Sequence, residues 1–169
     1  PHLSAFSHAA SRVGWSLPDC DTLTLHGRDA ANIEAFIQPG VRLLVLTADA
    51  STIAEVARRL CARKFDKSEI TVLENMGGER ERKSFFIADD IPSTEFSGLN
   101  TLAIRCVAAK DAQILSRLAG LPDDAFLHDG QLTKREVRAA TLAALSPAPD
   151  QLLWDIGAGC GSIAIEWMR

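Results

Sequence analysis

The stretch Val41-Arg-Leu-Leu-Val-Leu46 is a nearly continuous aliphatic run in the first half of the chain. Such a run is typical of a strand that is buried on both faces of a parallel sheet. It is followed by Thr52-Ile-Ala-Glu55, the pattern of a capping box, which predicts a helix that extends to about Arg63. A buried strand followed by a helix is the repeating unit of α/β proteins, so we expect an α/β fold.

The segments on both sides of this stretch alternate in the same way. Before it, the spacing of apolar residues predicts a helix, a strand and a second helix, over residues 4–13, 21–26 and 30–37. After it, three further strands are predicted, over residues 70–73, 85–91 and 99–107. The charged run Glu79-Arg-Glu-Arg-Lys83 alternates in sign and is interpreted as a solvated helical turn. The mixture of elements allows antiparallel pairing near the end of this half.

Length and composition restrict the class of protein. The chain has 169 residues, which by length alone predicts about one domain, and its 47% of apolar residues exclude a disordered chain. Eighteen basic and 22 acidic residues give a net charge of −4, and no basic block is long enough to follow a phosphate backbone. No apolar run approaches the roughly 20 residues that span a bilayer. We therefore expect neither nucleic acid nor a membrane as a partner.

Cysteine spacing and the N-terminus bear on the cellular compartment. The four cysteines have neither C-x-x-C spacing nor a nearby pair of histidines, which indicates neither a zinc site nor a disulfide framework; they are Cys20, Cys61, Cys106 and Cys160. The first residues lack the basic start and apolar core of a secretory signal. We expect a cytoplasmic protein with reduced thiols and no metal. Because the sequence begins at Pro1 without an initiator Met, we expect it to be a segment of a longer protein.

A different unit is predicted in the last third of the chain. Residues 109–121 are compatible with a helix or a tether. Thr133-Lys-Arg-Glu136 is a second capping box that opens a helix, which Pro147 ends. Leu152-Leu-Trp-Asp-Ile156 then predicts a strand, followed by a glycine loop and by a helix that starts at Ser162.

The glycine loop is the motif that carries chemistry. In Asp155-Ile-Gly-Ala-Gly-Cys-Gly161, three glycines let the backbone turn sharply after a strand and approach a ligand closely. The dinucleotide fingerprint G-x-G-x-x-G would need a glycine at Ser162, but the third glycine comes one residue earlier. This spacing favours the acidic-x-G-x-G-x-G arrangement of adenosylmethionine enzymes. The alternatives are a structural glycine turn, a nucleotide-binding Rossmann oxidoreductase, and a non-catalytic binding or assembly fragment.

Two strings in the last third, residues 128–138 and 152–167, closely resemble the C-terminal domain of the precorrin-6Y C5,15-methyltransferase (decarboxylating) family of cobalamin biosynthesis. Upstream, four short segments resemble the second half of that family's N-terminal tetrapyrrole-methylase domain; they are Leu3–Phe6, Leu25–Arg28, Leu44–Asp49 and Leu73–Gly78. The resemblance thus covers essentially the whole chain, although neither domain is complete.

The resemblance implies a particular domain organisation and reaction. Residues 1–108 would be the C-terminal part of a tetrapyrrole-methylase domain, residues 109–122 a linker, and residues 123–169 the start of a Rossmann-like class I methyltransferase domain. The implied enzyme methylates a precorrin at C5 and C15 with S-adenosyl-L-methionine and removes an acetate side chain as carbon dioxide. The implied partner is this small tetrapyrrole, and a homo-oligomer is compatible with the sequence.

The resemblance also places the cofactor. It would lie at the glycine loop, formed by Gly157, Ala158, Gly159, Cys160 and Gly161, with Thr133 as a further contact. Thr133 is equally compatible with a helix N-cap. Asp155 would either brace the loop or approach the ammonium group of the cofactor. Cys160 is expected to be a loop position and not a reactive thiol.

Two further sets of residues are candidates for work on the substrate. His128 is considered as an acid–base group, although a loop histidine held by hydrogen bonds is the preferred interpretation. Lys134, Arg135 and Arg138 lie in the first turns of one helix, where they would either hold precorrin carboxylates or be ordinary solvated residues.

Two expected parts of the family's sites are absent from these residues. The glycine-rich cofactor loop near the start of a tetrapyrrole-methylase domain would precede Pro1. The later acidic residue that class I methyltransferases place on the cofactor ribose would follow Arg169. We therefore expect the activity to need more than this chain.

Overall fold

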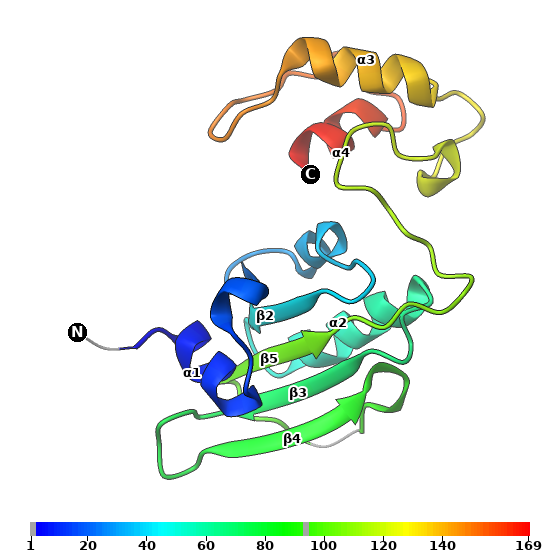
Figure 1. The fold of residues 1–169 in the computed structure, drawn as a ribbon. Coiled ribbons are helices and arrows are strands. Elements are labelled where there is room, and N and C mark those ends of the chain that lie inside the picture. Colours follow the sequence, from blue (N-terminus) through cyan, green and yellow to red (C-terminus); the bar gives the residue numbers. More distant parts are fainter. Residues whose placement is uncertain (1–2, 93–94) are drawn as a thin grey trace. The chain divides into compact units, whose positions relative to one another are not determined.

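The computed structural model describes residues 3–92 and 95–169, and the chain divides into two compact units. The first is Pro1–Ile114 and the second is Leu115–Arg169 (Figure 1). The division falls between Ile114 and Leu115, inside the segment that the sequence predicts as a linker. Each unit is described by itself.

The first unit is built on one mixed sheet of five strands. They are β1 (Asp21–Thr24), β2 (Arg42–Leu46), β3 (Glu69–Glu74), β4 (Arg82–Ile87) and β5 (Asn100–Arg105), in the spatial order β1-β2-β5-β3-β4. β1 and β2 are parallel, whereas β2–β5, β3–β5 and β3–β4 are antiparallel. The α/β class is confirmed, and the antiparallel pairing that the sequence allowed near the end of this half is present at β3, β4 and β5. The strand predicted from Val41–Leu46 for a parallel sheet pairs in parallel only with β1. An aliphatic run reports burial on both faces, and an antiparallel strand between two helical layers meets that condition as well.

Two helices cover the two faces of this sheet. α1 (Ala5–Val13) packs on the face that carries Leu44 and Ala103, and α2 (Ser51–Ala62) packs on the face that carries Leu43 and Ile104. This separation follows from the alternation of side chains along each strand. Short 3-10 helices complete the unit at Leu17–Asp19, Ala30–Ala35 and Ala88–Asp90.

The helix ends test the capping predictions. α1 matches the sequence, because the Ser4 hydroxyl accepts from the Ser7 amide at 3.1 Å and Gly14 closes the helix with a φ of 70°. The first capping box is wrong, because Asp49 and not Thr52 caps α2. The Asp49 carboxylate accepts from the Ser51 amide at 2.8 Å and from the Thr52 amide at 3.3 Å. A carboxylate is the stronger acceptor for these unpaired amides.

Two other expectations for the first unit are corrected. The predicted helix over residues 30–37 is a shorter 3-10 helix, and the predicted helical turn Glu79–Lys83 is a turn that leads into β4. The turn begins with Asn75 and Gly77, both at positive φ, and it brings Arg82 opposite Glu74 in the β3–β4 pair. Cross-strand pairing therefore overrides the local charge pattern.

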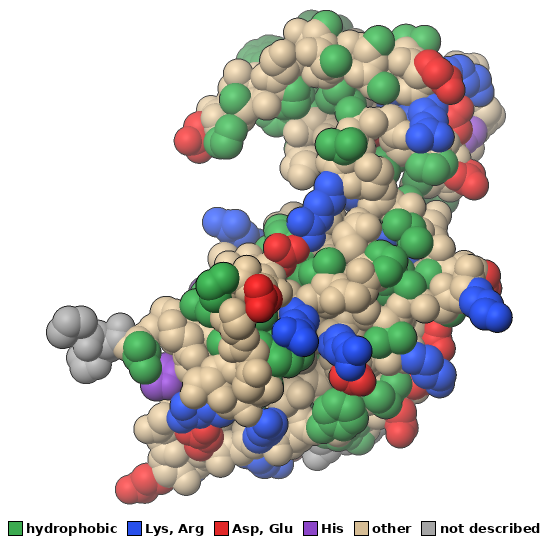
Figure 2. All heavy atoms as spheres, in the orientation of Figure 1, with side chains coloured by type: hydrophobic (Ala, Val, Ile, Leu, Met, Phe, Trp, Pro, Cys, Tyr) green, Lys and Arg blue, Asp and Glu red, His purple; other side chains and the backbone are tan. Residues whose placement is uncertain are grey.

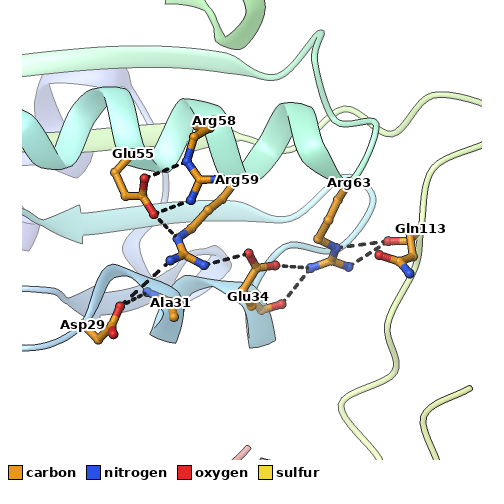
Figure 3. Close-up of polar contacts among 8 residues, drawn as sticks. All are labelled: Asp29, Ala31, Glu34, Glu55, Arg58, Arg59, Arg63 and Gln113. Carbon is orange, nitrogen blue, oxygen red and sulfur yellow. Dashed lines mark hydrogen bonds and ion pairs between the residues drawn. The ribbon is translucent and has the colours of Figure 1, made fainter. Parts of the chain in front are cut away.

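A network of arginines and carboxylates holds the last residues of the first unit to its helices (Figure 3). The side chain of Arg63 is buried and donates to the Glu34 carbonyl at 2.8 Å and to the Gln113 carbonyl at 2.9 and 3.1 Å. Arg58 donates to Glu55 at 2.7 Å and lowers the pKa of that carboxyl to about 2. The segment after β5 is thus fixed by backbone carbonyls bound to a buried cation.

The second unit contains α3 (Arg135–Leu145), α4 (Ser162–Met168) and a 3-10 turn at Asp123–Ala125. The predicted strand Leu152–Ile156 is wrong, since no residue described in this unit lies in a strand. Hydrophobic side chains remain on its surface (Figure 2), including Leu152, Trp154 and Ile156 at 82%, 79% and 92% exposure. A strand needs a neighbour for its backbone hydrogen bonds, and the described residues supply none here. Among those residues, no helix is long and apolar enough to cross a membrane.

The second unit is organised around Arg138, whose side chain is 0% exposed. Its Nε donates to Glu166 of α4 at 2.7 Å, and Nη1 donates to Asp123 at 2.9 Å. The guanidinium also donates to the carbonyls of Leu121 and Thr133 and lies 4.6 Å from the ring centre of Phe126. A cation taken from water into a small core needs this number of partners.

This arrangement explains why the second capping box is wrong. α3 begins at Arg135 after Lys134, and no side chain caps it. The carbonyl of Thr133, which would accept the first helical bond if Thr133 were the N-cap, is bound by the Arg138 side chain. The first backbone bond is instead made by the Lys134 carbonyl, which accepts from the Arg138 amide at 2.8 Å.

The first prediction concerns Glu74, whose side chain is 2% exposed and accepts from Arg82 at 2.5 and 2.8 Å and from the Ser97 amide at 2.7 Å. The Arg82 hydrogen bonds hold the pKa of Glu74 below its ordinary value. Glu74→Gln should destabilise the first unit by about 1–3 kcal/mol at pH 7. The wild-type advantage should shrink as the pH falls below about 4.3, where the unfolded carboxyl takes up a proton first. Hydrogen exchange of β3 amides at several pH values measures both effects.

Glu81→Gln is the control for this prediction. Glu81 pairs with Arg12 at the surface, and the two side chains are about equally exposed to solvent. Glu81→Gln should lower the stability of the first unit by less than Glu74→Gln does, because water screens the surface pair. Equal losses at pH 7 would show that the burial of Glu74 adds nothing.

The second prediction concerns the buried arginine. Arg138→Met should destabilise the second unit by about 3–5 kcal/mol, because the buried Glu166 carboxylate loses its cation. Arg135→Met removes an exposed arginine from the same helix, which donates to the Gly120 carbonyl at 2.7 Å, and should cost much less. Hydrogen exchange of α3 amides compares the two variants, and similar losses would contradict the central role of Arg138.

Candidate cofactor site

The glycine loop forms a sharp turn before α4. Gly157, Gly159 and Gly161 all have positive φ, at 77°, 58° and 72°, a region that side chains rarely adopt. The Gly161 amide donates to the Ala158 carbonyl at 2.9 Å, and the Gly161 carbonyl accepts from Ile165 at 2.8 Å. The three glycines are therefore required by the backbone, and the loop leads directly into the first turn of α4.

The loop is open on the side where side chains would project. A Cβ added at Gly157 or Gly159 would meet no atom within 4 Å, and one at Gly161 would approach only the side chain of Ile165, at 3.9 Å. Packing within the unit therefore does not explain the run of glycines. Open space next to a glycine backbone is the geometry that a closely approaching ligand would use.

Asp155 lies two residues before the loop. Its Oδ2 atom is buried and makes no hydrogen bond to any described residue. A buried carboxylate oxygen without a donor is unusual in a folded protein. Cys160, the remaining side chain of the loop, is a free and partly buried thiol.

Two other predicted site residues, Thr133 and His128, make their described hydrogen bonds outside the glycine loop. Thr133 is exposed and contributes its carbonyl to Arg138. His128 is exposed, and its Nδ1 accepts from the Gly130 amide at 3.0 Å, which matches the interpretation of a loop histidine held by a hydrogen bond. No described hydrogen bond joins either residue to residues 157–161.

The three basic candidates have different surroundings. Lys134 is exposed and lies 3.8 Å from Asp123, and Arg135 is exposed and donates to the Gly120 carbonyl. Arg138 is fully buried between two carboxylates, so it has no free face for a substrate carboxylate. The substrate-anchoring role considered for Arg138 is corrected on this ground, because its charge is already used within the core.

Sequence reasoning missed Glu166 and Asp123, the two partners of Arg138. Glu166 is a carboxylate in the apolar run Ser162-Ile-Ala-Ile-Glu-Trp-Met168, one helical turn after the buried Ser162. A lone charge on the buried face of a helix is the signal that could have indicated a partner for Glu166. The partner itself could not be read from spacing, because Arg138 is 28 residues away.

A hollow with a volume of about 220 Å³ lies on the first unit. Polar residues of α1, of β5 and of the turn after β3 line it, among them His8, Asn75, Asn100 and Thr101. None of the residues predicted from the sequence as site residues lines this hollow.

The chain is similar to known proteins in sequence and in fold. Residues 124–169 match the family model described as the precorrin methyltransferase domain. The fold is shared with the crystal structure of the methyltransferase CobJ, with a TM-score of 0.52, 11% identity, and coverage of 67% of this chain and 52% of that one. At this identity the likeness concerns the fold only.

Similarity in sequence extends over the whole chain. A Sinorhizobium protein named precorrin-6Y C(5,15)-methyltransferase [decarboxylating] is 46% identical over 99% of this chain and 41% of its own length. A Mycobacterium tuberculosis protein of the same name is 38% identical over 100% of this chain and 42% of its own length. The chain thus spans about two fifths of these relatives. Along all of that span, the chain is similar in sequence to relatives named precorrin-6Y C(5,15)-methyltransferase [decarboxylating].

Proposed function

We propose that this chain is part of an S-adenosylmethionine-dependent methyltransferase that methylates a precorrin at C5 and C15 and removes an acetate side chain as carbon dioxide, in cobalamin biosynthesis. The observation that carries the proposal is the whole-length similarity to relatives of that name, at 46% and 38% identity. The glycine loop supports it independently, because its backbone adopts positive φ at three glycines and its open side is free for a ligand.

The residues around the loop fit the methionine end of adenosylmethionine. The loop offers backbone atoms without side chains at Gly157 and Gly159. The unpartnered Oδ2 of Asp155 would accept a hydrogen bond from the cofactor's ammonium group. An ammonium there would supply the donor that this buried oxygen lacks within the described residues. In this proposal Asp155 binds the cofactor and does not merely brace the loop.

The chemistry of the bound cofactor is that of an activated methyl donor. The loop's part is to hold the donor so that an electron-rich carbon of the macrocycle can approach in line, and positioning of this kind lowers the barrier substantially. Backbone contacts at Gly157 and Gly159 would keep water from that side of the bound cofactor.

The polycarboxylate substrate would meet positive charge at Lys134 and Arg135, which are both exposed at the start of α3. Lys134 is held only loosely by Asp123, so a substrate carboxylate can compete for it. Thr133 stays a proposed cofactor contact through its exposed side chain. A cytoplasmic location and a homo-oligomer stay predictions.

The third prediction tests the loop. Gly159→Asp should abolish the binding of S-adenosylhomocysteine at the glycine loop, because a carboxylate would project into the space reserved for the ligand, and should leave the separate cofactor site expected in the tetrapyrrole-methylase domain. Gly27→Asp is the matched control, since Gly27 has a similar φ of 69° and equally open surroundings in the first unit. Both substitutions should cost about 1 kcal/mol of stability through backbone strain. Isothermal titration calorimetry on protein expressed from the complete reading frame compares their affinities.

Each result of this titration favours one of the functions considered. Loss of one binding site in Gly159→Asp, together with the wild-type number of sites in Gly27→Asp, supports the proposal. Binding of NAD in place of S-adenosylhomocysteine by the wild type would identify an oxidoreductase. Binding of neither ligand would favour a binding or assembly role.

The fourth prediction tests the reaction itself. The same protein, given precorrin-6Y and adenosylmethionine with a ¹³C-labelled methyl group, should yield a product with two new labelled carbons and release one carbon dioxide. Nuclear magnetic resonance of the product and gas analysis measure the two outcomes. Product formation that persists in Gly159→Asp without loss of either methyl group would remove the glycine loop from the reaction.

A further inference from the structure

Few contacts hold the glycine loop in place on the side of the preceding segment or on its open side. No residue of the preceding segment 152–156 lies in a described strand, and the Cβ positions of Gly157 and Gly159 face open space. The loop continues into α4, which has seven residues and so about two turns. A helix of this length is not stable by itself in water. The position of the loop therefore depends on what fixes α4.

Glu166 is the residue that fixes α4. It lies one turn after Ser162, and both are buried on the same face of the helix. The Glu166 carboxylate accepts from the backbone amides of Gly120 and Leu121, at 2.5 and 3.0 Å. These amides precede α3 in the chain, so one carboxylate binds α4 to a segment more than 40 residues earlier.

Arg138 adds a second connection to the same carboxylate. Its Nε donates to Glu166 Oε1 at 2.7 Å, and its remaining nitrogens bind Asp123 and the carbonyls of Leu121 and Thr133. Glu166 thus accepts three hydrogen bonds, all inside the unit. Charge-assisted bonds in a site without water define a geometry more narrowly than apolar packing does.

We propose that Glu166 and Arg138 are positioning residues for the glycine loop: through α4 they hold residues 157–161 in the conformation that binds the cofactor. Neither residue touches the loop in the described contacts, so both act through the helix. The proposal rests on the proposed binding of adenosylmethionine by the loop. In this proposal the buried ion pair of Glu166 and Arg138 preorganises the loop in addition to stabilising the unit.

The test measures the loop directly in the ligand-free protein expressed from its complete reading frame. Glu166→Gln keeps the size of the side chain but removes the charge that binds Arg138 and two amides. Hydrogen exchange at residues 157–161 should become faster. The dissociation constant for S-adenosylhomocysteine at the site that Gly159→Asp removes should rise about tenfold if the competent loop population falls to about a tenth. Arg138→Lys should change the hydrogen exchange and the dissociation constant in the same direction. It replaces Glu166→Gln as the test variant if Glu166→Gln does not fold.

Asp123→Asn is the matched control. It removes the other carboxylate bound by Arg138, at 2.9 Å, but Asp123 lies before α3 and makes no described contact with α4. Its melting temperature should fall, while the exchange of residues 157–161 and the dissociation constant stay close to those of the wild type. This combination separates an effect on the loop from a general loss of stability.

Three results would overturn the inference. In the first, Glu166→Gln and Arg138→Lys both melt at lower temperatures but keep the wild-type hydrogen exchange of the loop and the wild-type affinity. The ion pair would then have a purely structural role. The second is an equal loosening of the loop in Asp123→Asn. The third is faster exchange with no change in affinity. Failure of the wild type to bind S-adenosylhomocysteine would contradict the proposed function, while the exchange data would still decide whether the pair positions the loop.

Discussion

A charge taken out of water must be met by hydrogen bonds and opposite charge, and this constraint shapes both units of the chain. In the first unit it joins Glu74 to Arg82 across a hairpin and holds Gln113 to Arg63. In the second unit it makes Arg138 the largest fully buried side chain, with Glu166 and Asp123 beside it. Each of these buried charges joins segments that are distant in sequence, and so fixes where helices and loops lie.

The second unit shows the functional consequence most clearly. Its apolar core is small, with Leu121, Phe126 and Leu142 as its buried apolar side chains, and several large apolar residues remain exposed. A unit with so few apolar contacts relies on its polar network for a defined geometry. The glycine loop is attached to that network through α4, so the candidate cofactor site and the buried ion pair are parts of one arrangement.

Local sequence patterns predicted the structure correctly where neighbouring residues determine it. The helix from Ser4 to Gly14, the strands at Val41–Leu46 and Ile70–Leu73, and the glycine turn before Ser162 all follow from propensity, apolar spacing or positive φ. They failed where the packing of the unit brings another residue to the same group. The Thr133 carbonyl binds Arg138 instead of starting α3, and Glu79–Lys83 leads into a strand because Arg82 pairs with Glu74.

The sequence by itself determined the α/β class, the place and spacing of the glycine loop, and the family resemblance, because each resides in short strings of residues. Only the tertiary structure decided which charges are buried and which are free to meet a ligand. Arg135 and Arg138 stand three residues apart in one helix, yet one is exposed and the other is enclosed. The difference arises because Glu166, 28 residues beyond Arg138, folds back onto one face of that helix, and no local pattern records such a contact.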